Sequence, residues 1–254
     1  MNFTLVNGQI YTPGLAIVNA PQPYTPLGGD TLHISLDVSG NGKLTLTPDD
    51  DEPTRFHEIT IFLTSSEMER NFTVSNGTTP PQVSIDLDSN SDSDSSSNSN
   101  GSVTAYTGPI LSLEPDSTVK HVNWVWPDCF VGDGNSDDQG ARGNYNISLH
   151  QSFRWNSTDY YTVFDLPISV SNGIDEDAER VECGLLENEY RPALSAESDQ
   201  SDDLPGQPFM GEGVETTVLE GEEGENGGSR LGLESGVGKA LRWATIGLVL
   251  GAVL

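Results

Sequence analysis

Apolar and polar residues alternate with a period of two through much of the first 170 positions. From position 32 to 39, for example, Leu, Ile, Leu and Val alternate with His, Ser, Asp and Ser. Successive side chains of a strand point to opposite faces, so this alternation predicts strands with one buried face. We expect about seven such strands, at residues 15–18, 32–38, 58–64, 83–87, 118–126, 143–154 and 159–170.

Gly, Pro, Asn and Asp residues separate these segments, as expected for turns between strands. No stretch before the C-terminal tail repeats its apolar residues at helical spacing. Roughly seven half-buried strands over this length fit two packed antiparallel sheets. The sequence therefore predicts an all-β fold, an immunoglobulin-like β-sandwich that occupies residues 1–189.

Two regions lack this pattern. Residues 89–102 are Ser, Asn, Asp and Gly, with no apolar side chain. Because such a segment has nothing to bury that would offset the entropy lost on ordering, we expect a mobile loop. Residues 190–226 are rich in Glu, Asp, Gly, Ser and Pro, with isolated apolar residues such as Phe209 and Leu219. Charges of one sign repel each other, so this segment is expected to be a disordered acidic stalk.

The C-terminus has the layout of a glycosylphosphatidylinositol (GPI) attachment signal. Small residues at 226–229 precede a mostly polar spacer and an apolar tail at 243–254. A helix of that tail would rise only about 18 Å, against roughly 30 Å of membrane hydrocarbon. We expect attachment at Asn226, with Gly227 as the second choice, and removal of 227–254. The alternative is an ordinary C-terminal helix.

No signal peptide is visible at the other end, because Met1 leads directly into strand-like sequence. GPI anchors are attached in the endoplasmic reticulum, so we expect an upstream leader beyond the sequence. The expected location is extracellular, at the outer leaflet of the plasma membrane or in a cell wall.

Charge excludes one class of partner. The chain carries 39 acidic against 11 basic residues, a formal net charge of −28. A field of that sign repels nucleic acid, and no basic cluster offsets it. Only 34% of the residues are hydrophobic, below the globular average of roughly 45–50%, so part of the chain should lie outside any core.

The chain has two cysteines, Cys129 and Cys183. An even number in a secreted chain suggests a disulfide, which would hold residues 174–189 against the domain and place its boundary near Tyr190. Two unpaired cysteines are the alternative. Six Asn-x-Ser/Thr sequons indicate N-glycosylation. They lie at Asn2, Asn71, Asn76, Asn100, Asn146 and Asn156.

Three tryptophans are candidates for contact with a polysaccharide. Trp124 and Trp126 lie two apart on a predicted strand, so both side chains share one face. If exposed, they would form a shelf that stacks on sugar rings; if buried, they are core residues, the interpretation that we favour. Trp155, next to the sequon at Asn156, is a third candidate.

Asp133, Asn135 and Asp137 have the spacing of the first half of a calcium-binding loop. Asp138 replaces the expected Gly, and Asn144 replaces the closing Glu, so a solvated acidic loop is the favoured interpretation. We expect no other cofactor. The chain has no Gly-x-Ser-x-Gly and no His-Glu-x-x-His motif, so we expect a non-catalytic protein.

Three parts of the chain carry a resemblance: Phe3–Val18, the acidic anchored tail, and Gly143–Val170 with its sequence GNYNISLHQSFRWNSTDYYTVFDLPISV. Together they resemble the secreted, GPI-anchored surface glycoproteins of filamentous fungi that have no assigned activity. The resemblance is one of layout and implies a cell-surface or cell-wall protein. A neighbouring family is the anchored copper-binding sandwich related to polysaccharide monooxygenases, whose ligand is an N-terminal histidine that is not seen in this sequence.

Overall fold

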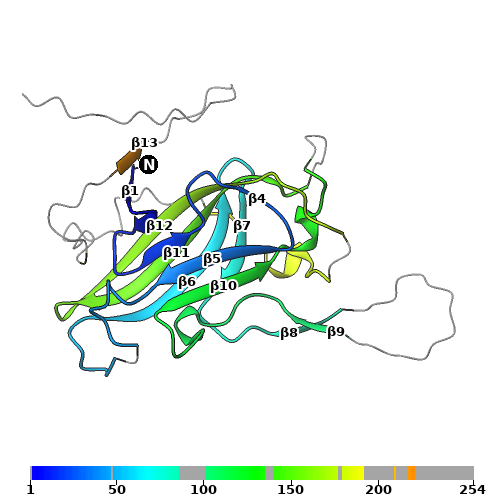
Figure 1. Cartoon of the computed structure of the whole chain (residues 1–254). Helices are drawn as coiled ribbons and strands as arrows, with labels where there is room; N and C mark the ends of the chain where they lie inside the picture. The colour runs from blue at the N-terminus through cyan, green and yellow to red at the C-terminus, as the bar shows by residue number, and fades with distance from the viewer. Residues whose placement is uncertain are drawn as a thin grey trace, which may run out of the picture. The chain divides into compact units, whose positions relative to one another are not determined.

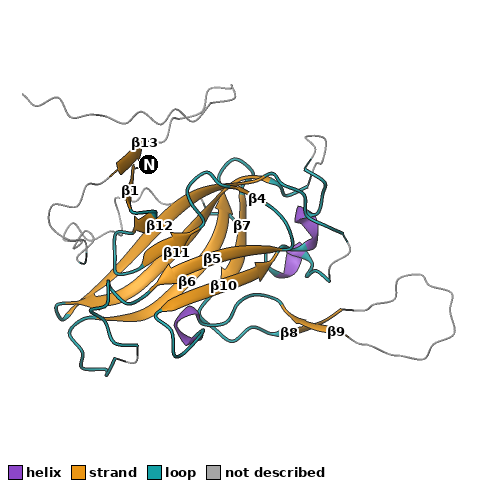
Figure 2. Cartoon of the chain, viewed as in Figure 1, coloured by secondary structure: helices purple, strands orange, loops and turns teal. Residues whose placement is uncertain are grey.

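A computed structural model describes residues 2–46, 48–85, 101–134, 140–176, 179–191, 209 and 217–220. Within these residues the chain is all-β, and its helical turns are three short 3-10 segments (Figures 1 and 2). They are η1 (Ile110–Ser112), η2 (Asp128–Phe130) and η3 (Cys183–Leu185). The expectation of an all-β, antiparallel fold is confirmed.

The first sheet has six strands, and every neighbouring pair in it is antiparallel. Its order is β10 (Val119–Val125), β5 (Thr31–Asp37), β3 (Ile17–Ala20), β2 (Gln9–Tyr11), β1 (Asn2–Val6) and β13 (Thr217–Glu220).

The second sheet has five strands and is built around one long hairpin. Its order is β4 (Pro26–Leu27), β12 (Thr158–Val170), β11 (Gly143–Trp155), β6 (Arg55–Ser65) and β7 (Arg70–Ser75). Strands β11 and β12 pair along their full lengths, and β4 adds a short parallel edge to β12. A separate antiparallel pair joins β8 (Gln82–Ile85) to β9 (Gly101–Thr104).

Alternate residues of both sheets form one hydrophobic core. In β5 the buried positions are Leu32, Ile34 and Leu36, and in β11 they include Leu149 and Phe153. The seven expected strands are therefore present, each within a few residues of its predicted bounds. Short strands such as β2, β4, β7 and β9 were not expected from the pattern, whereas β1 lies where the chain opens on strand-like sequence.

One polar side chain crosses the core. Gln151 of β11 is fully buried; its Nε2 donates to Thr12 Oγ1 at 2.9 Å, and its Oε1 accepts from the backbone N–H of Ala16 at 2.9 Å. A buried amide must find such partners, since leaving it unpaired would be costly. A Cβ on Gly14 would lie 2.8 Å from the Gln151 amide, so only glycine leaves room for this link.

The regions expected to lack structure have a mixed outcome. Strand β9 begins at Gly101, inside the expected loop, while residues 89–100 lie outside the described part. Phe209 and β13 fall in the expected stalk, and the compact unit runs from Met1 to Glu220, beyond the predicted boundary at 189. Asn226, Gly227 and the tail at 243–254 are outside the described residues. No helix in the described part is long and apolar enough to cross a membrane.

Candidate functional site

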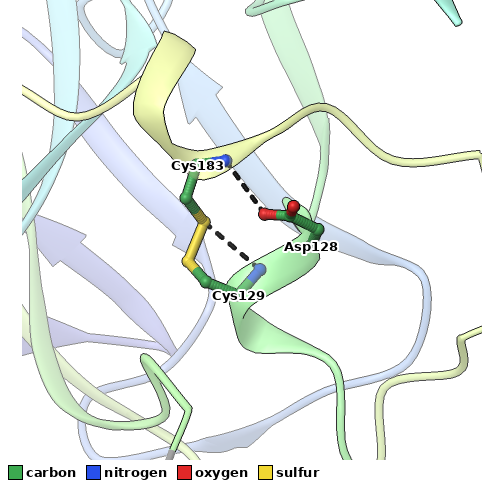
Figure 3. Close-up of side chains that lie close together, drawn as sticks. All are labelled: Asp128, Cys129 and Cys183. Carbon is green, nitrogen blue, oxygen red and sulfur yellow. Dashed lines mark hydrogen bonds between the residues drawn. A yellow bond between two sulfur atoms is a disulfide. The ribbon is translucent and has the colours of Figure 1, made fainter.

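The two cysteines meet at a junction that closes one end of the domain. Cys129 of η2 and Cys183 of η3 form a disulfide with Cα atoms 5.9 Å apart (Figure 3). The Asp128 carboxylate accepts from the backbone N–H of Cys183 at 2.9 Å, which fixes the two helical turns against each other. Asp128 and the two sulfurs have the proximity of metal ligands, but sulfurs joined in a disulfide are not thiolates and do not bind a metal in this way.

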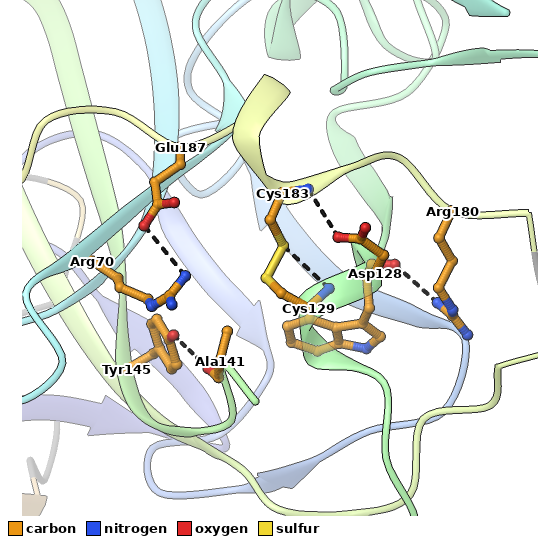
Figure 4. Close-up of a disulfide and its surroundings, with 9 residues drawn as sticks. Arg70, Asp128, Cys129, Ala141, Tyr145, Arg180, Cys183 and Glu187 are labelled. Atoms are coloured by element: carbon orange, nitrogen blue, oxygen red, sulfur yellow. Dashed lines mark hydrogen bonds and ion pairs between the residues drawn. A yellow bond between two sulfur atoms is a disulfide. The ribbon is translucent and has the colours of Figure 1, made fainter. Parts of the chain in front are cut away.

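Arg180 strengthens the same junction from the side of the chain that follows β12 (Figure 4). Its side chain is only 3% exposed. It donates to the backbone oxygens of Trp126 and Asp175, each at 2.9 Å. Further along, the backbone N–H of Asn188 donates to Asn71 O of β7 at 2.7 Å. These contacts hold Arg180, Cys183 and Asn188 against the domain.

An aromatic cluster lies behind the disulfide. Trp124 and Trp126 are 2% and 0% exposed, and their rings pack edge to face with centroids 5.6 Å apart. Phe130 contacts Trp126 at 5.3 Å and Tyr145 at 5.5 Å. The shelf interpretation of Trp124 and Trp126 is thus wrong and the core interpretation holds, because the shared face of β10 points inward.

Tyr145 ties this cluster to the backbone. It lies near the start of β11, and its buried hydroxyl donates to the backbone oxygen of Ala141 four residues earlier (Figure 4). Burial raises the pKa of the Tyr145 hydroxyl well above its usual value, with Arg70 opposing and Glu187 adding to the shift. The hydroxyl is consequently a permanent donor at physiological pH.

Trp155, the third sugar-contact candidate, lies at the opposite end of β11. It is half-buried, and its ring meets the ring of Phe209 edge to face with centroids 5.4 Å apart. One tryptophan alone thus remains near the surface in the described part, and another aromatic side chain covers part of it.

The outer face of the five-stranded sheet carries a cluster that sequence reasoning missed. We call it the outer-face patch, and it consists of Phe62, Ser148, His150, Tyr161 and Asp165. Its members alternate with core residues on β6, β11 and β12, so they share the face that points away from the core. Period-two alternation alone could have identified the positions, but not their contacts across strands.

His150 occupies the middle of this patch. Its ring lies edge to face with Phe62 at 5.2 Å, and its Nδ1 hydrogen-bonds the hydroxyl of Tyr161, whose side chain is 48% exposed. Beside it, Ser148 Oγ donates to the Asp165 carboxylate at 2.6 Å. Burial lowers the pKa of His150 and the Asp165 charge opposes this shift, so the imidazole is mainly neutral near pH 7. The patch thus combines aromatic side chains with a neutral imidazole and the Asp165 carboxylate.

An ion-pair network lies beside the turn that connects β11 and β12. Asp159 accepts from Arg154 Nε and from His57 Nε2, each at 2.9 Å. The hydrogen bonds from Arg154 and then His57 lower the pKa of Asp159 to about 2. Both His57 and Asp159 are exposed, so the network is a solvated ion pair and does not form an enclosed reaction site.

The expected calcium loop is only partly described. Asp133 is exposed and precedes Gly134, whereas Asn135 and Asp137 lie outside the described residues. Two of the three predicted ligands therefore lie outside the described residues, and calcium stays a sequence prediction.

The sequons differ in their surroundings. Asn156 is exposed at the tip of the β11–β12 hairpin, where it and Ser157 have φ of +47° and +66°, the conformation of a tight two-residue turn. Asn146 is half-buried on the outer face. Asn71 has its Oδ1 buried, and its sequon partner Thr73 accepts from Asn188 Nδ2 at 2.9 Å.

Of the three remaining sequons, one borders a turn and the side chains of the other two are not described. Asn76 accepts from both the N–H and the hydroxyl of Thr78, at 3.1 and 2.8 Å. Asn2 is in β1, and Asn100 is outside the described residues.

Comparison with known proteins identifies no relative. No family model matches the chain, no curated protein is significantly similar to it, and no solved structure matches its fold. Functional inference therefore has to come from the contacts described above.

Proposed function

We propose that this chain is a non-catalytic, N-glycosylated surface protein of the secretory pathway, tethered by a GPI anchor. The observation that carries the proposal is the Cys129–Cys183 disulfide at the junction. Disulfides persist in oxidising compartments outside the cytosol. A disulfide together with N-glycosylation sequons on the surface is the combination expected of an extracellular domain.

The strand order supports an immunoglobulin-like sandwich as the folded part of this protein. If β3, β5 and β10 are strands A, B and E, and β6, β7, β11 and β12 are C, C′, F and G, the two sheets read A–B–E and C′–C–F–G. These are the neighbours found in immunoglobulin sheets of the variable type. In place of strand D, the described residues contain the separate β8–β9 pair.

The Tyr145 hydrogen bond adds independent support. Immunoglobulin-like domains often carry a tyrosine near the start of strand F whose hydroxyl bonds the backbone a few residues upstream. Tyr145 stands near the start of β11 and bonds Ala141 in this way. The disulfide differs from the usual link between strands B and F, because it joins the segment after β10 to the segment after β12.

Glycans fit the outer surface of this domain. Asn156 at the hairpin tip would carry a glycan into solvent. Asn146 pairs across strands with Thr64 and Pro167, one row from Phe62 and Asp165 of the outer-face patch. A glycan at Asn146 would therefore stand over this patch and shield its aromatic side chains.

The rival function, binding of cell-wall polysaccharide through surface tryptophans, loses its main support. Two of its three candidates are core residues, and Trp155 is partly covered by Phe209. We expect tryptophan emission to stay unchanged when the protein is titrated with glucan or chitin oligomers. A saturable shift that disappears in Trp155→Ala would instead favour the carbohydrate-binding alternative.

The anchor is tested by expressing the chain behind a secretory leader in a eukaryotic host. The mature protein should end at Asn226 or Gly227, and a phosphatidylinositol-specific phospholipase should release it from intact cells. Gly228→Glu should block processing at Asn226, because the transamidase needs small residues after the attachment site. Ser201→Glu, outside the signal, is the matched control. A surface protein that retains residues 243–254 would contradict the anchor.

A further inference from the structure

Phe209 is a buried aromatic residue within the acidic segment that follows the domain. Residues 190–226 contain ten acidic side chains and one basic one, a composition typical of disordered chain. Phe209 is nevertheless only 3% exposed and belongs to the domain's core cluster. A single buried anchor in such a segment needs a specific acceptor on the folded part.

The acceptor is a socket at the end of β11 and in the turn after β5. We call it the Phe209 socket, and it consists of Gly40, Asn41, Lys43, Leu44 and Trp155. The Trp155 ring contacts Phe209 edge to face at 89°, and Lys43 Nζ lies 5.7 Å from the centre of the Phe209 ring. Asn41 Nδ2 donates to the backbone oxygen of Phe209 at 3.3 Å.

Gly40 makes room for the ring. A Cβ at this position would lie 2.6 Å from Phe209 Cε2 and 2.8 Å from Leu44 Cγ, closer than any side chain tolerates. Its φ of +55° is also in the left-handed region that favours glycine. Both the left-handed turn and the space taken by the Phe209 ring therefore require glycine at position 40.

We propose that the Phe209 socket is a binding site for one aromatic side chain of an acidic peptide. Its resident occupant is the chain's own segment around Phe209, which acts as a releasable latch. The Lys43 ammonium attracts the Phe209 ring through a cation–π contact, and its charge also attracts the acidic residues that flank Phe209 in the sequence.

The span between the two attachment points is compatible with a latch in the same molecule. Asn188 bonds Asn71, which pairs through Thr64 with Asn146 of β11, and Trp155 lies nine residues further along that strand. At about 3.4 Å per residue this is roughly 30 Å. The eighteen residue steps from Arg191 to Phe209 reach up to about 60 Å, so they can bridge it.

The latch should be closed but weakly held. Burial of a Phe side chain and its aromatic contact favour closure, and the entropy of closing the intervening loop opposes it. We expect the closed form to exceed the open form by on the order of 10- to 100-fold. A tethered anchor has an effective concentration near the millimolar range, so a free peptide must compete at comparable concentration.

Limited digestion of the full chain with chymotrypsin tests the latch. The readout is cleavage after Phe209, followed by mass spectrometry and normalised to cleavage after Tyr190. Trp155→Ala should accelerate the Phe209 cut on the order of 10-fold or more, because the open form becomes dominant. Lys43→Glu, an exposed change that spares the core, should accelerate it by about two- to fivefold. Phe62→Ala is the matched control and should leave the rate unchanged.

A peptide titration asks whether the socket binds in trans. Full-length Phe209→Ala should show Trp155 emission that is red-shifted, and a peptide of residues 203–215 should reverse the shift with half-saturation between roughly 10 μM and 1 mM. The same peptide with Ala in place of Phe should have no effect. Both responses should vanish in a Trp155→Phe background, which separates Trp155 from the other three tryptophans of the chain.

Equal cleavage rates in wild type and Lys43→Glu, together with no response to the peptide, would overturn the proposal even if Trp155→Ala failed to fold. Protection of Phe209 should not depend on protein concentration. Protection that weakens on dilution would instead assign the socket to the Phe209 segment of a second copy and would overturn the latch. Neither result depends on secretion, glycosylation or the anchor.

Discussion

Replacing Tyr145 by Phe removes one hydroxyl group and preserves the ring contacts with Phe72 and Phe130. The acceptor, the backbone oxygen of Ala141, belongs to a residue that is 1% exposed, so water cannot readily replace the lost donor. An unpaired buried carbonyl costs about 1–3 kcal/mol, and we expect the free energy of unfolding to fall by that amount. The melting temperature should drop by about 2–4 °C for each kcal/mol in a domain of this size.

Chemical denaturation of wild type and Tyr145→Phe, compared from pH 5 to 11, measures this effect. The pKa of the buried hydroxyl is raised in the folded state, so its contribution is fully present below the unfolded pKa near 10 and declines as pH rises beyond it. The difference between the proteins should therefore be constant to about pH 9 and shrink above pH 10. Tyr160→Phe is the control, because its hydroxyl makes no hydrogen bond within the described residues. A loss under about 0.5 kcal/mol, or equal losses in both variants, would refute the reasoning.

Three further predictions concern the disulfide, the surface ion pairs and glycosylation. Substituting both Cys129 and Cys183 by Ser should lower the free energy of unfolding by about 4 kcal/mol in denaturant titrations, because the disulfide closes a loop over a sequence separation of 54. Asp159 has a lowered pKa of about 2, so its ion pairs stabilise the fold above the unfolded pKa near 4, and this stabilisation is lost as the pH falls toward 2. In Asp159→Asn, the melting temperature should therefore depend less on pH between about 4 and 2 than it does in wild type. Thr158→Ala should remove the mass of one N-glycan from secreted protein without lowering the melting temperature, since Thr158 is exposed and Asn156 keeps its place in the left-handed turn.

Each of these predictions has a contrary outcome. Free thiols at both cysteines in a non-reducing digest would contradict the disulfide. They would also contradict the proposed extracellular location, which rests on the disulfide. If the melting temperatures of Asp159→Asn and wild type depend on acid pH in the same way, the ion pairs of Asp159 contribute nothing measurable to stability. Many exposed ion pairs behave in this way. Asn71→Gln is the control for glycosylation, and loss of a glycan there would show that the partly buried sequon is used.

Long strands were predictable because their information is local. Strands β5, β11 and β12 repeat apolar residues at every second position over seven or more residues. Strand β4 has two residues and exists only because it pairs with the end of β12, so no local pattern reveals it. Periodicity also placed Trp124 and Trp126 on one face without saying which face is buried, because that depends on the sheet packed against it.

Side-chain contacts between distant positions were beyond the sequence. Tyr145 reads as one more inward residue of a strand, and its hydroxyl bond depends on how the preceding turn folds. Phe209 reads as a stray apolar residue in acidic chain, since its acceptor is formed by Gly40 and Trp155 far away in sequence. A single aromatic residue forms no periodic pattern that would predict its burial. The sequence around Gly40 likewise does not indicate that an aromatic ring packs against it.

The latch alters what the acidic segment does if the anchor is attached at Asn226. A free segment from Arg191 to Asn226 would behave as a flexible chain of 35 residue steps, with a mean reach of roughly 30–35 Å. With Phe209 docked, only 17 steps remain free and the reach falls to roughly 20–25 Å. The pairing of β13 with β1 leaves six steps beyond Glu220, or about 20 Å when fully extended. The free tether would then start near the Trp155 end of β11 or at the β1 edge, instead of at the disulfide junction where the domain's last packed residues lie. While β13 stays paired with β1, release of Phe209 leaves those six steps unchanged, so an acidic peptide that competes for the Phe209 socket would lengthen the tether only if β13 also separates from β1.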